Sequence, residues 1–428
     1  MTYDEALERI HSLLTFGSRP GLDRMRELLR RMGDPQDRLR YIHVAGTNGK
    51  GSICAVLSSI LVASGCKTGL FISPYITDFR ERIQIDNEMI SRETLTAAVE
   101  ETFPLIEQLR SEGIVITEFE YVNALEFYIH AQAGCDIVVL ETGMGGLLDC
   151  TNVILPPLCA VIATIGLDHT AILGDTIEKI AEQKCGILKK GSVAVTSAQC
   201  DEAMRVIRDT ADALGIPLIE SGSVALTAED ITLGGTDLIY CGEKMHLSLA
   251  GDHQIENART ALAAIEALTE RGILNISASD IREGLQKAVN PARLEVLHQS
   301  PLVLLDGAHN PNGVEALKRA IDRFLGGRRV FCVMGMLADK DSDSSLELLD
   351  GAFEAIYTVP IDNPRALSSE ALAEKCRAHA AEVKAFDSAE AAFDAAYARA
   401  EAEDAAVLVC GSLYLAGAIR PYIIKKFL

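Results

Sequence analysis

Continuous apolar runs alternate with segments of helical periodicity along most of the chain. Such runs, when bounded by polar residues or glycine, are typical of strands buried on both faces of a parallel sheet. The clearest runs are residues 41–44, 67–72, 135–140, 158–165, 192–196, 302–305, 330–334, 355–359 and 406–409. Between them, residues 94–109, 118–131 and 253–268 place apolar side chains at helical spacing. The alternation predicts an α/β fold whose parallel sheets are covered by helices.

Three stretches depart from this alternation and indicate how the chain is divided. Residues 1–38 are helical in pattern, with a break at 17–21, and residues 224–249 show the short alternating runs of a small antiparallel sheet. The alternation restarts after residue 290, and a chain of 428 residues is long enough for two domains. We therefore predict an N-terminal P-loop ATPase-like domain with a mostly parallel sheet, residues 1–290. A smaller C-terminal Rossmann-like α/β domain would follow, residues 291–428.

Composition narrows the class of protein. Hydrophobic residues make up 48% of the chain, yet no apolar run approaches the roughly 18 residues that a membrane span needs. The N-terminus shows no signal-peptide pattern. A formal net charge of -21 argues against a nucleic-acid partner, and 11 scattered cysteines without a CxxC pair suit a reducing compartment. We expect a cytoplasmic protein that binds neither membrane nor nucleic acid.

One glycine-rich stretch has the setting of a phosphate-binding loop. Residues 45–52 read Ala-Gly-Thr-Asn-Gly-Lys-Gly-Ser, after an apolar strand and before a helical segment. Glycines let the backbone approach an anion, and the amides and dipole of a helix N-terminus point at it. Lys50 would supply charge to the outer phosphates and Ser52 a hydroxyl near magnesium. The spacing differs from the common GxxxxGK[ST], so a plain turn is the alternative, but strand, lysine and hydroxyl together favour a nucleotide site.

Polar residues stand at the carboxyl ends of several apolar strands, where ligands gather in open α/β sheets. They are Ser73, Glu141, His169 and Asp306. Glu141 resembles the acidic metal ligand that accompanies a phosphate loop, although a carboxylate there also caps a following helix. Ser73 taken alone is more typical of a helix N-cap. His169 taken alone is either a second metal ligand or a loop histidine with protein partners.

Lys184 occupies the apolar stripe of the helical segment 177–188. By spacing alone, a lysine that extends to solvent is the simpler interpretation. The alternative is a partly buried amine with a lowered pKa, which reacts as a neutral nucleophile. Carbon dioxide would convert such an amine to a carbamate, an anion able to bind a cation.

Together these segments resemble the folylpolyglutamate synthase / dihydrofolate synthase family, within the Mur ligase superfamily of ATP-dependent amide-forming ligases. The resemblance runs from about residue 20 to the C-terminus. Its motifs are residues 46–52, 73–74, 117–120, 141–146 with Asp149 and 151–152, 168–169, 174–176, Lys184, 253–254 with Asn257, Arg293, 306–311 and 411–414.

The resemblance implies a set of site residues. The residues implied for ATP are Thr47, Asn48, Gly49, Lys50, Gly51, Ser52, Asn257, Arg293 and Asp306. Those implied for magnesium are Ser73, Glu141, His169 and Lys184 as its carbamate, and Lys50, Lys184 and His169 are the implied catalytic residues. The segments matching the pterin site are Thr117, Glu118, Phe119, Glu120, Leu148, Asp149 and Cys150.

The implied reaction uses ATP and Mg²⁺ to join L-glutamate to a small-molecule substrate, a reduced folate or dihydropteroate, through an acyl phosphate. A monomer is expected, with glutamate bound by the C-terminal domain. Two rivals remain: a muramyl ligase of the same superfamily, and a P-loop regulatory ATPase without amide chemistry. The matches at residues 117–120 and 168–169 favour folate.

Two residues depart from the family pattern. Leu147 stands where many members have arginine, and Tyr75 stands where the usual residue is histidine. Leu147 cannot supply an arginine's charge or fork of donors, which leaves a synthase of polyglutamates alone as the alternative to a bifunctional enzyme. Tyr75 bears on loop packing only.

Overall fold

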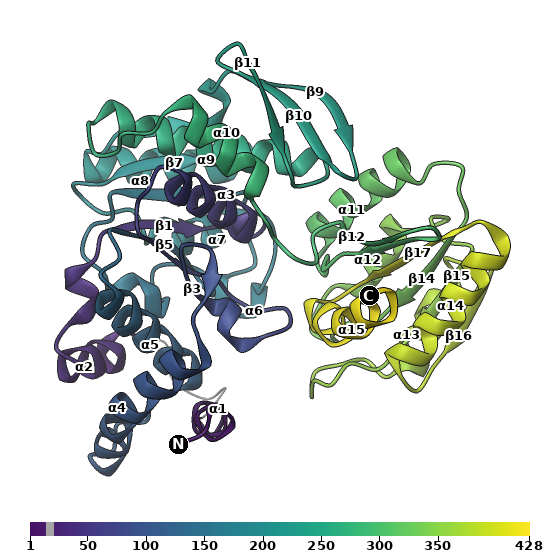
Figure 1. The fold of residues 1–428 in the computed structure, drawn as a ribbon, viewed down its shortest axis with the longest axis horizontal. Helices are drawn as coiled ribbons and strands as arrows, with labels where there is room; N and C mark the ends of the chain where they lie inside the picture. Colours follow the sequence, from purple (N-terminus) through teal and green to yellow (C-terminus); the bar gives the residue numbers. More distant parts are fainter. Residues whose placement is uncertain (14–20) are drawn as a thin grey trace. The chain divides into compact units, whose positions relative to one another are not determined.

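The computed structural model describes residues 1–13 and 21–428, which form two compact units (Figure 1). The first comprises Met1–Pro74, Arg80–Leu226 and Glu256–Ala288, and the second comprises Tyr75–Phe79, Thr227–Ile255 and Val289–Leu428. Most of the break expected at residues 17–21 lies outside the described residues. The domain limits of 1–290 and 291–428 stay a prediction.

An eight-stranded sheet forms the centre of the first unit, with the strand order β4-β3-β2-β5-β1-β6-β7-β8. Its strands are β1 (Tyr41–Ala45), β2 (Thr68–Phe71), β3 (Ile83–Ile85), β4 (Glu88–Met89), β5 (Ile137–Glu141), β6 (Cys159–Ile162), β7 (Val193–Thr196) and β8 (Leu218–Glu220). Neighbours from β2 to β8 run parallel, and only the β3 and β4 edge is antiparallel. The predicted mostly parallel sheet is confirmed.

Helices cover this sheet because its central strands are apolar on both faces. The helices are α1 (Tyr3–His11), α2 (Asp23–Arg31), η1 (Pro35–Arg38), α3 (Lys50–Ala63), η2 (Phe79–Arg82), α4 (Arg92–Ser111), α5 (Glu118–Ala133), η3 (Cys150–Val153), α6 (Thr170–Leu173), α7 (Ile177–Cys185), α8 (Asp201–Leu214), η4 (Ser221–Ser223), α9 (Asp252–Glu270) and α10 (Ala278–Lys287). The central helix α3 is buried along nearly its whole length, between the sheet and α10. The helix begins at Lys50, directly after the glycine-rich loop.

The second unit has a six-stranded sheet in the order β12-β13-β17-β14-β15-β16 and a three-stranded sheet. The strands are β9 (Leu226–Thr232), β10 (Gly235–Tyr240) and β11 (Glu243–Leu247) in the small sheet, and β12 (Glu295–Gln299), β13 (Leu302–Leu305), β14 (Val330–Met334), β15 (Ala355–Thr358), β16 (Glu382–Ala385) and β17 (Ala406–Cys410) in the larger one. All neighbours in the larger sheet are parallel except β12 with β13. The expected antiparallel excursion is the small sheet.

Alternate residues of the larger sheet pack against different helices of the second unit. These helices are α11 (Pro311–Phe324), α12 (Ser342–Leu348), α13 (Ser369–Cys376), α14 (Ala389–Glu403) and α15 (Leu413–Phe427). Leu304 packs in a cluster with residues of α11 to α13, whereas Val303 packs in a cluster with residues of α14 and α15. The sheet is therefore covered on both faces, as expected for a Rossmann-like unit.

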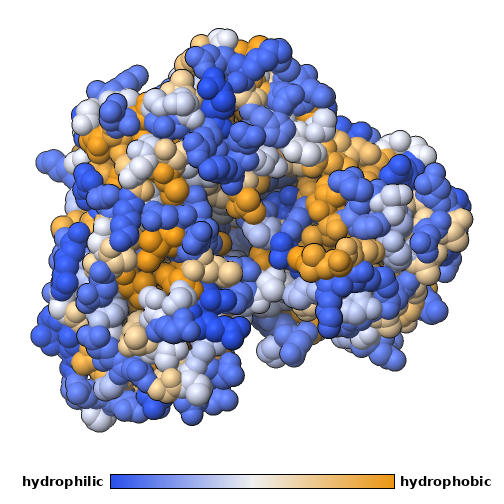
Figure 2. All heavy atoms as spheres, in the orientation of Figure 1, coloured by the Kyte–Doolittle hydropathy of each residue, from blue (hydrophilic) through white to orange (hydrophobic). Residues whose placement is uncertain are grey.

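Hydrophilic side chains predominate on the face of the molecule drawn in Figure 2, with smaller apolar patches among them. Across the described parts of the chain, the helices include none that is long and apolar enough to cross a membrane. The positive mean hydropathy of +0.17 fits the many fully buried strand residues.

Candidate active site

The glycine-rich loop lies between β1 and α3, as its flanking sequence predicts. Gly49 is the N-cap of α3 and has a φ of 88°, in the left-handed region that favours glycine. A Cβ atom there would lie 2.4 Å from Oδ1 of Asn257, and one at Gly46 would lie 2.5 Å from the Cβ of Ala163. Glycine is therefore required at both positions, because Ala163 packs directly against Gly46 and Asn257 against Gly49. Asn257, on α9, thus lies directly against the loop.

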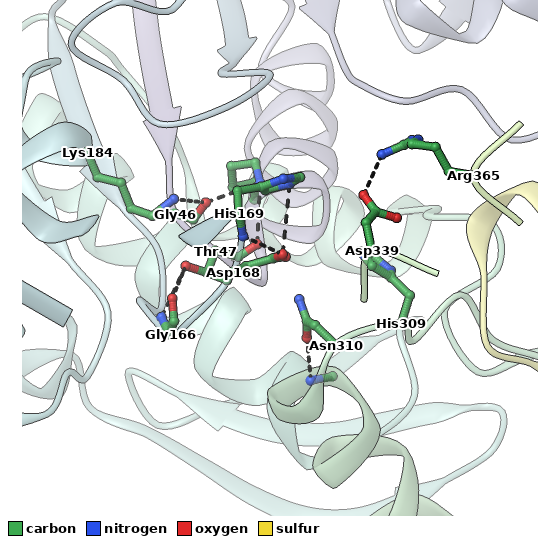
Figure 3. A network of polar contacts seen from close by, with 12 residues as sticks. Gly46, Thr47, Gly166, Asp168, His169, Lys184, His309, Asn310, Asp339 and Arg365 are labelled. Atoms are coloured by element: carbon green, nitrogen blue, oxygen red, sulfur yellow. Dashed lines mark hydrogen bonds and ion pairs between the residues drawn. The ribbon is translucent and has the colours of Figure 1, made fainter. Parts of the chain in front are cut away.

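The first half of this loop is tied to the segment after β6. The amides of Thr47 and Asn48 both donate to the carbonyl oxygen of Thr164, at 2.9 and 3.2 Å. The hydroxyl of Thr47 also donates to the carbonyl of Gly166 and accepts from its amide, each at 3.0 Å (Figure 3). The first-turn amides of α3 have no acceptor within the helix, so they are the groups suited to a phosphate.

Lys50 begins α3 and folds back over the loop. Its Nζ donates to the carbonyl oxygens of Gly46 and Thr47, at 3.2 and 3.4 Å, and lies 4.0 Å from Oε1 of Glu141. The side chain is 16% exposed, so its ammonium is partly desolvated beside one carboxylate. This places a positive charge at the mouth of the phosphate loop.

Ser73 and Glu141, from neighbouring strand ends, are brought together next to Lys50. The backbone amide of Ser73 donates to Oε2 of Glu141 at 3.1 Å. Arg82 was not anticipated from the sequence, and its Nη1 donates to the hydroxyl of Ser73 at 3.0 Å. It lies in a polar segment whose pattern gives no signal of this contact. Hydroxyl and carboxylate oxygens are ligands that Mg²⁺ prefers.

His169 lies at the N-terminus of the short helix α6, with a φ of 50°. Its amide donates to Oδ1 of Asp168 at 2.8 Å, and its Nε2 lies 4.0 Å from the same oxygen (Figure 3). Within residues 1–13 and 21–428, no three His, Cys, Asp or Glu side chains cluster in a way that could hold a metal. Of the four residues expected to bind magnesium, only Glu141 and His169 are of these types, since the other two are Ser73 and Lys184.

Lys184 is buried rather than extended to solvent. Only 3% of the residue is exposed, and its Nζ donates to the carbonyl oxygen of Gly46 at 2.7 Å (Figure 3). Burial lowers the pKa of Lys184 to about 7, helped by the charge of Lys50 and opposed by Asp168 and Asp149. A fair fraction of the amine is then neutral near pH 7, which is the form that reacts with carbon dioxide.

The polar residues of the 117–120 segment bond to the protein itself. Thr117 and Glu120 form a capping box at the start of α5, because the carboxylate of Glu120 accepts from the amide and hydroxyl of Thr117, at 2.8 and 2.9 Å. The other oxygen of Glu120 accepts from Arg24 at 3.0 Å. Glu118 lies 3.1 Å from Nδ1 of His11. These contacts order the N-terminus of α5.

Phe119 and the loop after β5 meet at a glycine. A Cβ atom at Gly143 would lie 2.2 Å from Cζ of Phe119, so the ring lies directly against that backbone. Leu147 and Leu148, further along the loop, are 45% and 47% exposed. Cys150 is half-buried, and burial raises the pKa of its thiol.

Asp149 is buried and organises the loop that precedes it. Its Oδ2 accepts from the amide of Met144 at 2.8 Å, and its Oδ1 accepts from the amide and the hydroxyl of Thr151, at 3.0 and 2.6 Å. Burial raises the pKa of Asp149, and these hydrogen bonds offset part of that effect. The carboxylate serves as an internal acceptor for its own loop.

In the second unit, Asp306 follows β13 and fixes the loop around Arg293. Its two carboxylate oxygens accept from the amides of Leu294 and Ala308, at 2.9 and 2.8 Å. Burial raises the pKa of Asp306, and the charge of Arg293 opposes that effect. A Cβ atom at Gly307 would lie 2.6 Å from Nη1 of Arg293, so the guanidinium lies across this glycine.

The residues on either side of Arg293 have strained backbone conformations. Ala292 and Leu294 have φ values of 55° and 49°, which non-glycine residues rarely adopt. Such strain persists only where surrounding contacts fix it, and it gathers at functional sites. The strained backbone therefore supports a functional role for the loop that carries Arg293.

Two further polar residues follow strands of the second unit. His309 lies in the predicted 306–311 motif, where it has no assigned role, and Asp339 was not anticipated from the sequence. Nδ1 of His309 lies 2.8 Å from the carbonyl oxygen of Gly307, and Asp339 forms an ion pair with Arg365 at 2.7 Å (Figure 3). Asp339 follows the apolar strand β14, so the rule used for the other strand ends could have found it.

Two family models match this chain and define its class. The Mur ligase middle domain matches residues 44–265, and the Mur ligase glutamate ligase domain matches residues 292–413. The protein is therefore an ATP-dependent amide-forming ligase of the Mur type, in agreement with a parallel sheet that carries a phosphate loop.

Individual relatives narrow the family. The dihydrofolate synthase/folylpolyglutamate synthase of Bacillus subtilis is 40% identical over 372 residues, 85% of this chain and 86% of the relative. The Escherichia coli enzyme of the same name is 36% identical over 397 residues, 92% and 89% of the two chains. A folylpolyglutamate synthase structure from Mycobacterium tuberculosis, complexed with ADP and AMPPCP, is 31% identical with a TM-score of 0.90, covering 98% and 99% of the chains. This chain belongs to the folylpolyglutamate synthase and dihydrofolate synthase family.

Proposed function

We propose that this chain joins L-glutamate to a reduced folate with ATP and Mg²⁺, and that it also joins glutamate to dihydropteroate. The observation that carries the proposal is one corner of the first unit. There Lys50 and Lys184 both donate to the carbonyl of Gly46, while Lys50 also lies beside Glu141. A phosphate loop that gathers two lysines and a carboxylate suits phosphoryl transfer to a carboxylate.

The reaction has two steps. An oxygen of the substrate carboxylate attacks the γ-phosphorus of ATP, the bond to the β-phosphate oxygen breaks, and ADP leaves an acyl phosphate behind. The neutral amine of glutamate then attacks the acyl carbon, phosphate leaves with the bonding electrons, and the amine loses a proton as the amide forms. Lys50 contributes by neutralising charge on the transferred phosphoryl group and by holding it in line with the attacking oxygen.

For magnesium, we propose Ser73, Glu141, His169 and the carbamate of Lys184 as ligands. The hydrogen bond from the backbone amide of Ser73 to Glu141 supports this, because it keeps the two residues adjacent and a carboxylate suits a hard cation. A bound magnesium ion would neutralise the charge that develops on the phosphates. If the carbamate is essential, Lys184→Ala loses activity, and short carboxylates such as acetate partly restore it.

For the nucleotide, we propose contacts from residues 47–52 together with Asn257, Arg293 and Asp306. The closeness of Asn257 to Gly49 supports its inclusion. Asp306 accepts backbone amides on both of its oxygens, so we assign it the task of holding the loop that presents Arg293.

For the pterin, we propose Phe119, Leu148, Asp149 and Cys150 as the lining, with Thr117, Glu118 and Glu120 shaping it through the start of α5. Relatives named for both synthase activities favour a bifunctional enzyme. Leu147, where many members have arginine, is the observation that favours a polyglutamate synthase alone. A monomeric state, a cytoplasmic location and the lack of a nucleic-acid partner stay predictions.

The test is incorporation of labelled glutamate by the purified protein, with tetrahydrofolate and with dihydropteroate under the same ATP and magnesium. Incorporation with both is expected. Incorporation with tetrahydrofolate alone would leave a polyglutamate synthase. ATP hydrolysis that neither compound stimulates would favour a regulatory ATPase, and stimulation by a muramyl substrate alone would favour a cell-wall ligase.

A further inference from the structure

A buried histidine, His43, is bonded to the residue that holds Asp149. The ring lies on β1, two residues before Ala45, and is fully buried. Its Nε2 lies 2.8 Å from Oγ1 of Thr151, the hydroxyl that also contacts Oδ1 of Asp149 at 2.6 Å. Three side chains thus connect the strand that leads into the phosphate loop with the loop that follows β5.

The donors in this chain of contacts can be assigned. A threonine hydroxyl has a single hydrogen, and the short contact with the carboxylate of Asp149 uses it. The second contact of that oxygen must then be one that it accepts, so Nε2 of His43 carries a hydrogen and donates it. Burial lowers the pKa of His43 to about 3, with a contribution from Lys189, so the ring stays neutral.

The other ring nitrogen indicates that His43 is not simply a filler of the core. Its Nδ1 is buried and has no hydrogen-bond partner. An unpartnered buried acceptor destabilises a fold, and an apolar side chain at this position would avoid that penalty. The ring therefore contributes one thing that a leucine could not, the donor at Nε2.

Other contacts hold the rest of the same loop. The amide of Leu147 donates to the carbonyl of Gln183 at 2.7 Å, and Nδ2 of Asn152 donates to the carbonyl of Gly186 at 3.0 Å. These bonds fasten the loop to the region of α7. They do not hold the side chain of Thr151, whose hydroxyl is bonded to His43 and to Asp149. The amides of Met144 and Thr151 also donate to Asp149, so the hydroxyl of Thr151 is one of three donors that orient this carboxylate.

We propose that His43 is a positioning residue for the substrate loop, which we define as residues 143–149. It orients Thr151, Thr151 orients Asp149, and Asp149 holds the amide of Met144 and hence the shape of the loop. Because β1 continues into the phosphate loop, the same chain of bonds sets the substrate loop relative to the phosphate loop. The name of the substrate loop rests on the proposed function, but the bonding chain does not.

Matched variants separate the donor from the bulk of the side chain. In His43→Gln the amide nitrogen reaches the position of Nε2, whereas in His43→Asn it reaches only the position of Nδ1. Thr151→Ser keeps the hydroxyl, and Thr151→Val removes it at nearly constant shape. The first measurement is amide hydrogen exchange in the ligand-free protein, compared between the substrate loop and helix α3.

We expect His43→Asn and Thr151→Val to speed exchange of the Met144 amide about tenfold, the effect of losing one hydrogen bond. His43→Gln and Thr151→Ser should stay near the wild type, and exchange in α3 should not change. The double variant His43→Asn/Thr151→Val should exchange no faster than either single variant, because both break one chain. Unchanged exchange in His43→Asn, or an equal rise in α3, would overturn the proposal.

An activity measurement then tests the consequence. His43→Asn should raise the KM for the folate about tenfold while the KM for ATP stays within about twofold, and His43→Gln should restore the folate KM. An equal rise in both KM values would overturn the positioning role. If no folate is turned over by the wild type, the proposed function fails, and the exchange experiment still decides the role of His43.

Discussion

Lys184 donates a hydrogen bond to the carbonyl oxygen of Gly46 at 2.7 Å, so a buried amine is in contact with the first glycine of the phosphate loop. Lys50 donates to the same oxygen at 3.2 Å. Two amines on one carbonyl repel each other when both are charged, and this repulsion adds to burial in lowering the pKa of Lys184. The arrangement keeps a reactive amine next to the site proposed for phosphates.

Replacing Lys50 tests the phosphate loop. Lys50→Ala should lower kcat by at least about a hundredfold, the scale expected when a preorganised charge on the transition state is lost. The melting temperature should change little, because the ammonium bonds to two carbonyls of its own loop at 3.2 and 3.4 Å and pairs with Glu141 only at the long distance of 4.0 Å. Normal melting combined with near-normal turnover would rule out this role.

Replacing Glu141 tests the magnesium site. Glu141→Gln keeps the shape of the side chain but removes its charge, so half-maximal activity should need several times more magnesium. His169→Ala should act in the same direction. The measurement is initial rate against magnesium concentration at fixed ATP. If both variants keep the wild-type curve, the two residues have structural roles only.

The lowered pKa of Lys184 predicts how stability depends on pH. Its pKa is about 7 in the folded chain and near its ordinary 10.5 in the unfolded chain, so between these values the unfolded chain binds more protons. The free energy of unfolding contributed by this group therefore rises as pH increases from 7 towards 10. Lys184→Met lacks the group and serves as the reference.

The measurement is the melting temperature of both proteins from pH 6 to pH 9 in buffers free of carbon dioxide. Above pH 7, the melting temperature of the wild type should rise steadily relative to that of Lys184→Met. A difference that does not depend on pH would mean that the amine titrates normally in the folded protein.

The side chain at position 147 tests the choice of substrate. Leu147 is 45% exposed, so an arginine fits there without repacking the core. Leu147→Arg should raise the rate with dihydropteroate relative to tetrahydrofolate, because it restores a charge and a fork of donors. Leu147→Met, of similar size and no charge, is the control. Equal rate ratios in all three proteins would remove this residue from the account of specificity.

Much of the fold could be predicted because its strands are apolar on both faces. The runs at β13 and β14 match the predicted residues 302–305 and 330–334. The edge strands β8, β12 and β16 were missed, because they are short and half exposed and lack a continuous apolar run. The hairpin of β3 and β4 was missed for the same reason.

The candidate site was predictable where backbone geometry requires a residue type, as at Gly49. The site was harder to predict where a residue's role depends on contact with another side chain. The pattern Thr117-x-x-Glu120 is a capping box, and that signal was present in the sequence. By contrast, nothing in the sequence places Arg82 on Ser73 or His43 on Thr151, since those contacts join distant segments.

The central claim, that a folate carboxylate is activated as an acyl phosphate, is tested most directly by isotope transfer. Tetrahydrofolate labelled with ¹⁸O in its carboxylates is incubated with the protein, ATP, magnesium and glutamate, and the released phosphate is analysed by mass spectrometry. We predict one ¹⁸O atom in each phosphate released by the first glutamate addition, because the attacking oxygen leaves with the phosphoryl group; the measurement is therefore made before a second glutamate is added. Amide formation with unlabelled phosphate would contradict the mechanism, and phosphate released without amide would contradict the function.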